Sequence, residues 1–119
     1  MLTYIDRAFA LLLLLGAAGH TAGSLTLLPA GSDTQVWSLG AALGAALIAI
    51  LNFVRAGRPD DRPVIWMALF GATGWFAVAI LFGWTLGDFL DFRVAWHGFA
   101  ALALAGFSLR MALNPARRP

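Results

Sequence analysis

The chain contains no cysteine, no lysine and no glutamate, and only 12% of its 119 residues are charged. Without cysteine, disulfide bonds, thiolate zinc sites and cysteine nucleophiles are excluded. Soluble domains average about a quarter charged residues and about half apolar ones, whereas this chain is 61% hydrophobic. Because so few polar side chains are available to cover the surface, apolar side chains must face lipid. The composition predicts a membrane protein with one small domain, residues 1–119.

All eight basic residues are arginines, a usage typical of GC-rich coding, and we infer a bacterial source from it. The net charge is only +2. The arginines stand at the ends of apolar runs and form no basic stripe with interleaved aromatics, so no nucleic-acid partner is expected. Neither a Ser/His/Asp constellation nor a phosphate-binding glycine motif occurs in the sequence, and we expect no enzyme activity.

Four apolar runs are separated by short polar segments, and they cover about residues 6–28, 34–54, 62–86 and 88–114. At 1.5 Å per residue, each run is long enough to cross the ~30 Å hydrocarbon core of a bilayer as an α-helix. The first run is interpreted as a span and not as a cleaved signal peptide. The short connections predict an all-α, antiparallel up-down-up-down bundle of four transmembrane helices.

Capping residues mark the expected ends of these helices. Ser32, with Gln35 three residues later, predicts a capping box for the second helix. Asp61 is expected to cap the third helix and Asp88 the fourth. Gly87 is expected to end the third helix in a left-handed conformation.

The arginines predict the orientation in the membrane. If the helices alternate in direction, one side carries Arg7, Arg55, Arg58, Arg62, Arg110, Arg117 and Arg118. Arg93 alone falls on the other side. The positive-inside rule assigns the arginine-rich side to the cytoplasm. Both termini are therefore expected in the cytoplasm, with the protein in the bacterial inner (plasma) membrane.

Small residues recur four positions apart along the spans. Gly19 and Gly23 do so in the first span, which also contains Gly16, and Gly40 and Gly44 do so in the second. Lipid supplies no hydrophobic force between helices, so membrane helices are held together by close backbone approach at such residues. These five glycines are predicted to lie at helix contacts. The second span also offers a contact for a homodimer or a larger membrane complex.

The other polar side chains within the spans are few. Asn52 is expected to form a hydrogen bond across the bundle. Ser24 and Ser38 are expected to bond back to carbonyl groups of their own helices. These expectations leave the histidines as the main candidates for chemistry.

The two histidines, His20 and His97, both fall in the outer half of the predicted membrane, at depths of roughly 12 and 8 Å. Residues three and four positions away share a helix face, and around His20 these include Gly16 and Gly23. Arg93 lies one turn outward from His97. We expect the two imidazole rings to approach each other over a groove of small residues, with Arg93 above them.

Three interpretations of this pair are open. In the first, the imidazoles only satisfy polar groups inside a packed, purely structural bundle. In the second, His20, His97 and Arg93 form a ligand site in a binding or accessory subunit, either for haem b or, with Asp88 or Asp91, for zinc or copper. In the third, a titratable histidine serves a proton-coupled carrier or pore for small solutes, working as a dimer.

Two histidines from different spans, their small neighbours and one arginine at the membrane face resemble the haem site of small membrane cytochromes b. The resemblance is confined to these residues. It implies haem b between the first and fourth helices, with Arg93 pairing with a propionate. Adjacent helices in a tight bundle lie ~8–10 Å apart. Two axial histidines with iron between them need on the order of 13 Å between backbones, so haem requires splayed or diagonal helices.

Overall fold

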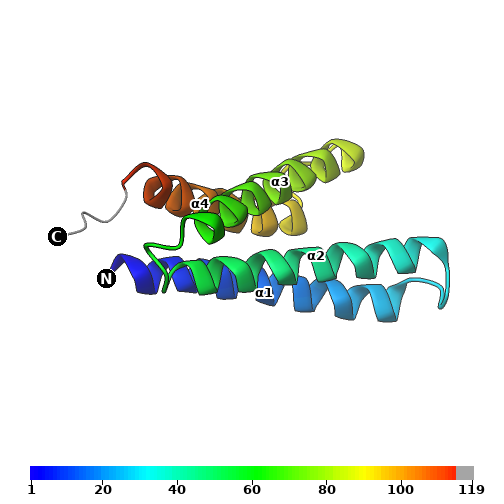
Figure 1. Ribbon diagram of the computed structural model, residues 1–119. Helices are drawn as coiled ribbons and strands as arrows, with labels where there is room; N and C mark the ends of the chain where they lie inside the picture. Colours follow the sequence, from blue (N-terminus) through cyan, green and yellow to red (C-terminus); the bar gives the residue numbers. More distant parts are fainter. Residues whose placement is uncertain (115–119) are drawn as a thin grey trace.

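The computed structural model describes residues 1–114, which form four α-helices and no strand (Figure 1). The helices are α1 (Leu2–Leu27), α2 (Asp33–Arg55), α3 (Arg62–Leu86) and α4 (Phe92–Leu113). Their ends agree with the predicted runs to within four residues. All four helices are long and apolar enough to span a membrane. Arg117 and Arg118, which contributed to the predicted orientation, lie outside the described residues.

The predicted caps of α2 and α3 are present. The Ser32 hydroxyl accepts a hydrogen bond from the Gln35 backbone N–H at 3.2 Å. In a capping box the Gln35 side chain would accept from the backbone N–H of Ser32. Here its Oε1 atom accepts from the N–H of Gly31 instead, at 2.8 Å, so this second hydrogen bond is shifted by one residue. The Asp61 carboxylate accepts from Val64 N–H at 3.3 Å and caps α3.

The turn between α3 and α4 differs from the prediction in one residue. Gly87 ends α3 with a φ of 66°, the left-handed conformation that was expected. Asp88, however, accepts from the N–H of Leu90 within the turn. The cap of α4 is Asp91, whose carboxylate accepts from the N–H of Arg93 at 2.9 Å. The chain needs these extra residues to reverse direction, so α4 begins later than predicted.

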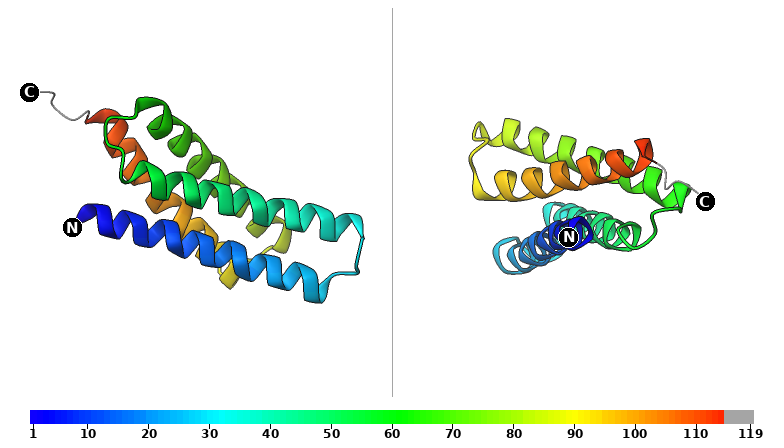
Figure 2. Two further views of the ribbon diagram at one scale, coloured as in Figure 1. Left: turned by 60° about the horizontal axis from the view of Figure 1, so that its bottom comes forward. Right: turned by 90° about the vertical axis from the view of Figure 1, so that its left-hand side faces the viewer.

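The four helices are arranged as two pairs in two layers. Helix α1 packs mainly on α2, and α3 packs mainly on α4, while α1–α4 and α2–α3 contacts join the layers (Figure 2). The layers cross at an angle. They lie close together where segment 56–61 joins α2 to α3, and they diverge toward segments 28–32 and 87–91 (Figures 1 and 2).

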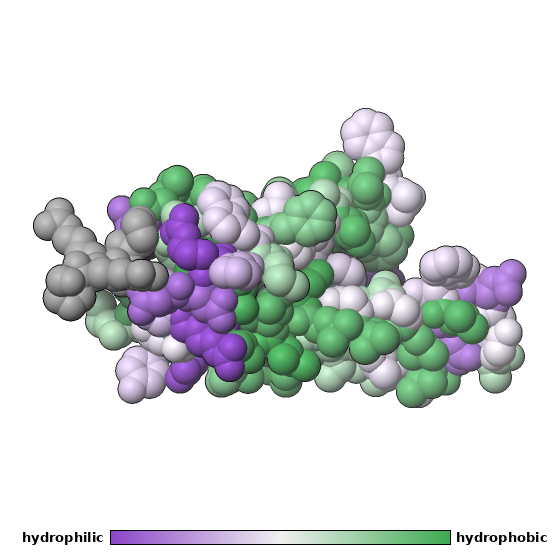
Figure 3. Space-filling model, viewed as in Figure 1, coloured by the Kyte–Doolittle hydropathy of each residue, from purple (hydrophilic) through white to green (hydrophobic). Residues whose placement is uncertain are grey.

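Small side chains fill the interface between the layers. The buried core cluster is largely alanine, and its members are Ala10, Leu13, Ala49, Ala72, Ala100 and Leu104. Many large apolar side chains point outward instead; Phe70, for example, is 83% exposed. The space-filling view shows a hydrophobic band between hydrophilic ends (Figure 3). This distribution is typical of helices whose outer surface contacts lipid.

Only part of the predicted glycine packing is present. A Cβ atom placed on Gly16 would lie 2.9 Å from Trp96 Cδ1 and 3.0 Å from His97 Cε1, which marks a close helix contact. At Gly44 the nearest atom belongs to Trp75, at an ordinary 3.7 Å. A Cβ would meet nothing within 4 Å at the remaining three, Gly19, Gly23 and Gly40. The predicted close packing at these three is not found within the described residues, and a contact with a second chain there stays a prediction.

A buried ion pair joins α1 to α2 near segment 56–61. The guanidinium of Arg55 donates from Nη1 and Nη2 to the two carboxylate oxygens of Asp6, at 2.7 and 2.6 Å. Arg55 is 0% exposed and Asp6 is 4% exposed. Burial of a charged pair in this geometry is tolerated because each charge has its partner. Arg55 is therefore a buried structural residue and not only a charge that orients the protein in the membrane; no local sequence pattern predicts this pair.

The predicted hydrogen bond of Asn52 across the bundle is confirmed. Its side-chain oxygen accepts from Ser108 on α4 at 3.1 Å and from Arg55 Nη2 at 3.2 Å. The ion pair and Asn52 together connect α1, α2 and α4. This end of the bundle is thus closed by directional contacts, whereas the other end is where the layers diverge.

Candidate ligand-binding site

The structure brings His20 of α1 and His97 of α4 together where the two layers begin to diverge. The centroids of their rings lie 6.3 Å apart, and the ring planes are inclined by 77°. Each side chain is half-buried. The sequence therefore predicted both the proximity of the two histidines and the pair of helices from which they come.

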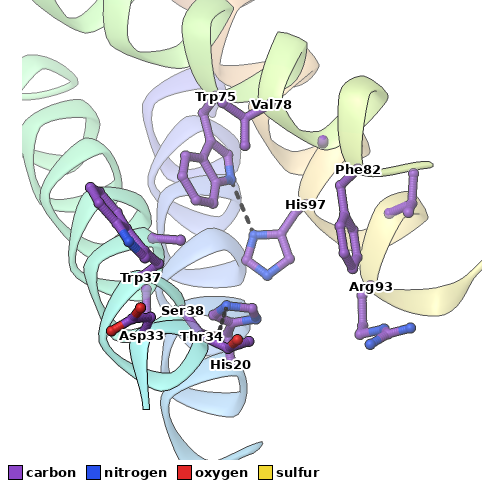
Figure 4. A pocket seen from close by; sticks show the side chains of 14 residues that line it. His20, Asp33, Thr34, Trp37, Ser38, Trp75, Val78, Phe82, Arg93 and His97 are labelled. Atoms are coloured by element: carbon purple, nitrogen blue, oxygen red, sulfur yellow. Dashed lines mark hydrogen bonds between the residues drawn. The ribbon is translucent and has the colours of Figure 1, made fainter. Parts of the chain in front are cut away.

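Each imidazole is held by one side chain from a different helix (Figure 4). The indole N–H of Trp75 on α3 donates to Nδ1 of His97 at 3.2 Å. The Ser38 hydroxyl on α2 lies 3.0 Å from Nε2 of His20. All four helices therefore contribute to the site. Trp75 and Ser38 orient the rings, and neither residue belongs to the site predicted from the sequence.

Ser24 and Ser38 form a short chain of hydroxyl groups beside His20. Ser24 donates to the carbonyl oxygen of His20 at 2.8 Å, as expected for a serine bonded to its own helix. The hydroxyl oxygens of Ser24 and Ser38 are 2.6 Å apart. The expectation that Ser38 bonds to its own helix was wrong, because its side chain reaches α1 instead. In the sequence, the only indication of this pair of hydroxyl groups is that Ser24 stands one helical turn after His20.

Gly16 provides the close approach that seats His97. The ring of His97 and the indole of Trp96 both lie where a side chain at Gly16 would project. The indole N–H of Trp96 also donates to the carbonyl oxygen of Leu12 at 2.9 Å. Helix α4 is thereby fixed to α1 at this level. The small residues around His20 thus have a local purpose, since one of them makes room for the opposing ring.

A cleft with two lobes lies between the layers beside the histidines. The lobe on the α2–α3 side has a volume of about 500 Å³, and the lobe on the α1–α4 side has about 610 Å³. Their walls are mostly apolar and aromatic, including Trp37 in the first lobe and Trp96 in the second. Both lobes are lined by the same six residues where they meet: His20, Thr34, Ser38, Phe82, Arg93 and His97. The histidines therefore lie at the junction of the lobes.

Arg93 lines the cleft but is paired with a neighbour on its own helix end. Its guanidinium donates to both carboxylate oxygens of Asp91, each at 2.9 Å, and lies over the ring of Phe82 at 5.3 Å (Figure 4). The hydrogen bonds from Arg93 lower the pKa of Asp91 to about 2. Asp91 is therefore ionised throughout the physiological range, and Arg93 carries its own counter-ion.

The predicted acidic metal ligands do not join the two histidines. Among residues 1–114, no group of three or more histidine and acidic side chains is placed to hold a metal ion. Asp91 is bonded to Arg93, and Asp88 accepts from a backbone N–H in the turn. Axial ligation of haem would use one nitrogen from each imidazole; Nε2 of His20 is bonded to Ser38 and Nδ1 of His97 to Trp75, which leaves the other nitrogen of each ring. The arrangement favours a hydrogen-bonding site over a metal site.

Comparison with known proteins finds no matching family model, no matching curated protein and no matching solved structure. The geometry of this site is therefore the basis on which a function can be proposed.

Proposed function

We propose that the protein is an integral protein of a bacterial inner membrane, an antiparallel up-down-up-down bundle with both termini in the cytoplasm. The end of the bundle at which segment 56–61 lies carries the arginines Arg7, Arg58, Arg62 and Arg110. Arg93 is the one basic residue at the other end within residues 1–114, and it is neutralised by Asp91. The positive-inside rule then orients segment 56–61 toward the cytoplasm.

Cysteine labelling tests this orientation. In intact cells, a membrane-impermeant maleimide is expected to modify Ser32→Cys and not Arg58→Cys, and the natural chain supplies a background without cysteine. Permeabilising the cells should make both positions reactive. Modification of Arg58→Cys and not of Ser32→Cys in intact cells would reverse the proposed orientation.

We further propose that the protein is a binding or accessory subunit that holds a lipid-soluble small molecule beside His20 and His97, and that it is not an enzyme. The observation that carries this proposal is the cleft whose two lobes meet at the histidines. The layers are closely packed near segment 56–61 but leave this open cleft beside the histidines, a space for which a bundle with a purely structural role has no need. Apolar walls with a few convergent polar groups are typical of small-molecule sites.

The cleft also agrees with one requirement of a proton-coupled carrier, which is space around His20. A carrier needs in addition a polar route to the other side of the membrane. Between the histidines and the Asp6–Arg55 pair, the core consists of apolar side chains such as Leu13, Ala49 and Leu104. A carrier would have to open this layer, whereas a binding subunit uses the cleft as it stands.

Photolabelling with a decyl chain that carries a diazirine tests the binding function. The purified protein is expected to be labelled saturably on Trp75 and Phe82 in the cleft, with Phe70 on the outer surface as the internal reference. Gly19 borders the cleft and has open space around it, so Gly19→Leu should fill the cleft without disturbing the fold. We expect about a tenfold loss of affinity, equivalent to ~1.4 kcal/mol. Labelling that follows surface exposure alone, with no effect of Gly19→Leu, would refute the proposal.

A further inference from the structure

The hydroxyl chain beside His20 determines where that ring carries its proton. A serine hydroxyl has one proton to donate, and Ser24 uses its proton for the carbonyl oxygen of His20. In the 2.6 Å contact between the two hydroxyls, Ser38 must therefore be the donor. Ser38 then accepts from Nε2–H of His20 across their 3.0 Å contact. In the neutral ring, Nδ1 of His20 is left as a hydrogen-bond acceptor.

Trp75 determines the proton position of His97 in the same way. An indole N–H can only donate, so Nδ1 of His97 is unprotonated. The proton of the neutral ring is on Nε2. Neutral rings are favoured at this depth because an unpaired charge within the hydrocarbon is costly. The two rings therefore offer one acceptor, Nδ1 of His20, and one donor, Nε2–H of His97, and the backbone of Gly16 lies beside that donor.

The rest of the cleft disfavours an anionic ligand and favours an elongated ring compound. The one cationic group of the cleft, Arg93, is held by Asp91, and the other charged group of the lining is the exposed carboxylate Asp33 at the start of α2, so no free cation is left for an anionic head group. Aromatic side chains stand on both sides, with Trp37 and Trp75 in one lobe and Trp96 in the other. A cavity of about 150 Å³ is enough for benzene, so each lobe also has room for an alkyl substituent.

We propose that the cleft binds an alkylated quinol, an inference that rests on the binding function proposed above. One ring hydroxyl donates to Nδ1 of His20, and a second ring oxygen accepts from Nε2–H of His97. The ring lies among the aromatic side chains, and its alkyl chain extends along a lobe between the helix pairs. The oxidised quinone has only acceptor oxygens and cannot satisfy Nδ1 of His20, so the site selects the reduced form. The proposal concerns binding and includes no electron transfer.

Three probes of nearly equal shape test this selection. 2-Decylhydroquinone, decylbenzoquinone and 1,4-dimethoxy-2-decylbenzene are titrated anaerobically into the purified protein, with tryptophan fluorescence as the readout. We expect the hydroquinone to bind about fivefold more tightly than either of the others, because it makes one more hydrogen bond to the histidines and each bond contributes about 1 kcal/mol. His20→Phe should remove this preference, so that the hydroquinone and the dimethyl ether bind with equal affinity.

A second measurement does not depend on ligand binding. Nitrogen-15 NMR of labelled histidine should show both rings neutral and protonated on Nε2, and Ser38→Ala should change the spectrum of His20 but not that of His97. Equal affinities for the three probes, or His20 protonated on Nδ1, would overturn the quinol assignment while the binding function stands. Absence of saturable binding by all three probes, together with failure of the photolabelling experiment, would overturn both proposals.

Discussion

Replacing Arg55 with methionine is expected to destabilise the bundle by about 3–5 kcal/mol, the usual consequence of leaving one partner of a buried ion pair without the other. Both oxygens of Asp6 are bonded to this guanidinium, and neither residue has more than 4% of its surface exposed. The side-chain oxygen of Asn52 also loses the hydrogen bond that Arg55 Nη2 donates to it. The effect is measured as the fall in unfolding temperature of the purified protein in detergent.

Two further variants separate this pair from ordinary surface charges. Arg58→Met removes an exposed arginine whose guanidinium lies 3.7 Å from Asp61, and the expected cost is about 0–1 kcal/mol. The double variant Asp6→Leu/Arg55→Met leaves no uncompensated charge and should recover most of the lost stability. If Arg55→Met unfolds at the same temperature as Arg58→Met, the Asp6–Arg55 pair does not hold the bundle together.

The second large effect is expected from Gly16→Leu. The new side chain would project into the space that Trp96 and His97 occupy at 2.9–3.0 Å from its Cβ. Helices α1 and α4 must then separate, and overpacking of this kind costs about 1–3 kcal/mol. The hydrogen bond from Trp96 to Leu12 is lost with the contact, so both the unfolding temperature and the tryptophan fluorescence should change.

Gly19→Leu is the matched control, because it places the same side chain on the same helix less than one turn away. No atom lies within 4 Å of a Cβ at Gly19, so we expect an unfolding temperature close to that of the natural protein. The contrast between the two variants tests where α1 meets α4. A larger destabilisation by Gly19→Leu than by Gly16→Leu would mean that the contact face of α1 had been assigned to the wrong side.

The helices and most of their ends were predictable because the relevant interactions are local. A run of about 20 apolar residues determines a span, and a capping side chain bonds to a backbone N–H two or three residues away, as at Ser32 and Asp61. Even here the competition between Asp88 and Asp91 for the cap of α4 was decided by the geometry of the turn. Which of two nearby carboxylates caps a helix depends on where the chain completes its reversal.

The contact of His20 with His97 was predictable from span length and chain direction. The partners that orient the rings were not, because Trp75 and Ser38 come from helices whose rotation about their axes the sequence leaves undetermined. The glycine spacing was ambiguous for the same reason. Gly16 and Gly19 lie on adjoining faces of α1, and only the packing shows that the first faces α4 at close range.

The sequence by itself determined that this chain forms four membrane-length helices with two histidines at similar depth, since apolar length and local capping depend only on neighbouring residues. The tertiary structure decided the rest. It paired Asp6 with Arg55 across 49 positions of sequence, separated the layers beside the histidines, and directed the hydroxyl of Ser38 toward His20. Each of these results depends on the rotation, crossing angle and spacing of several helices at once. These quantities are set by contacts between side chains on different helices, and therefore not by neighbouring residues in the sequence.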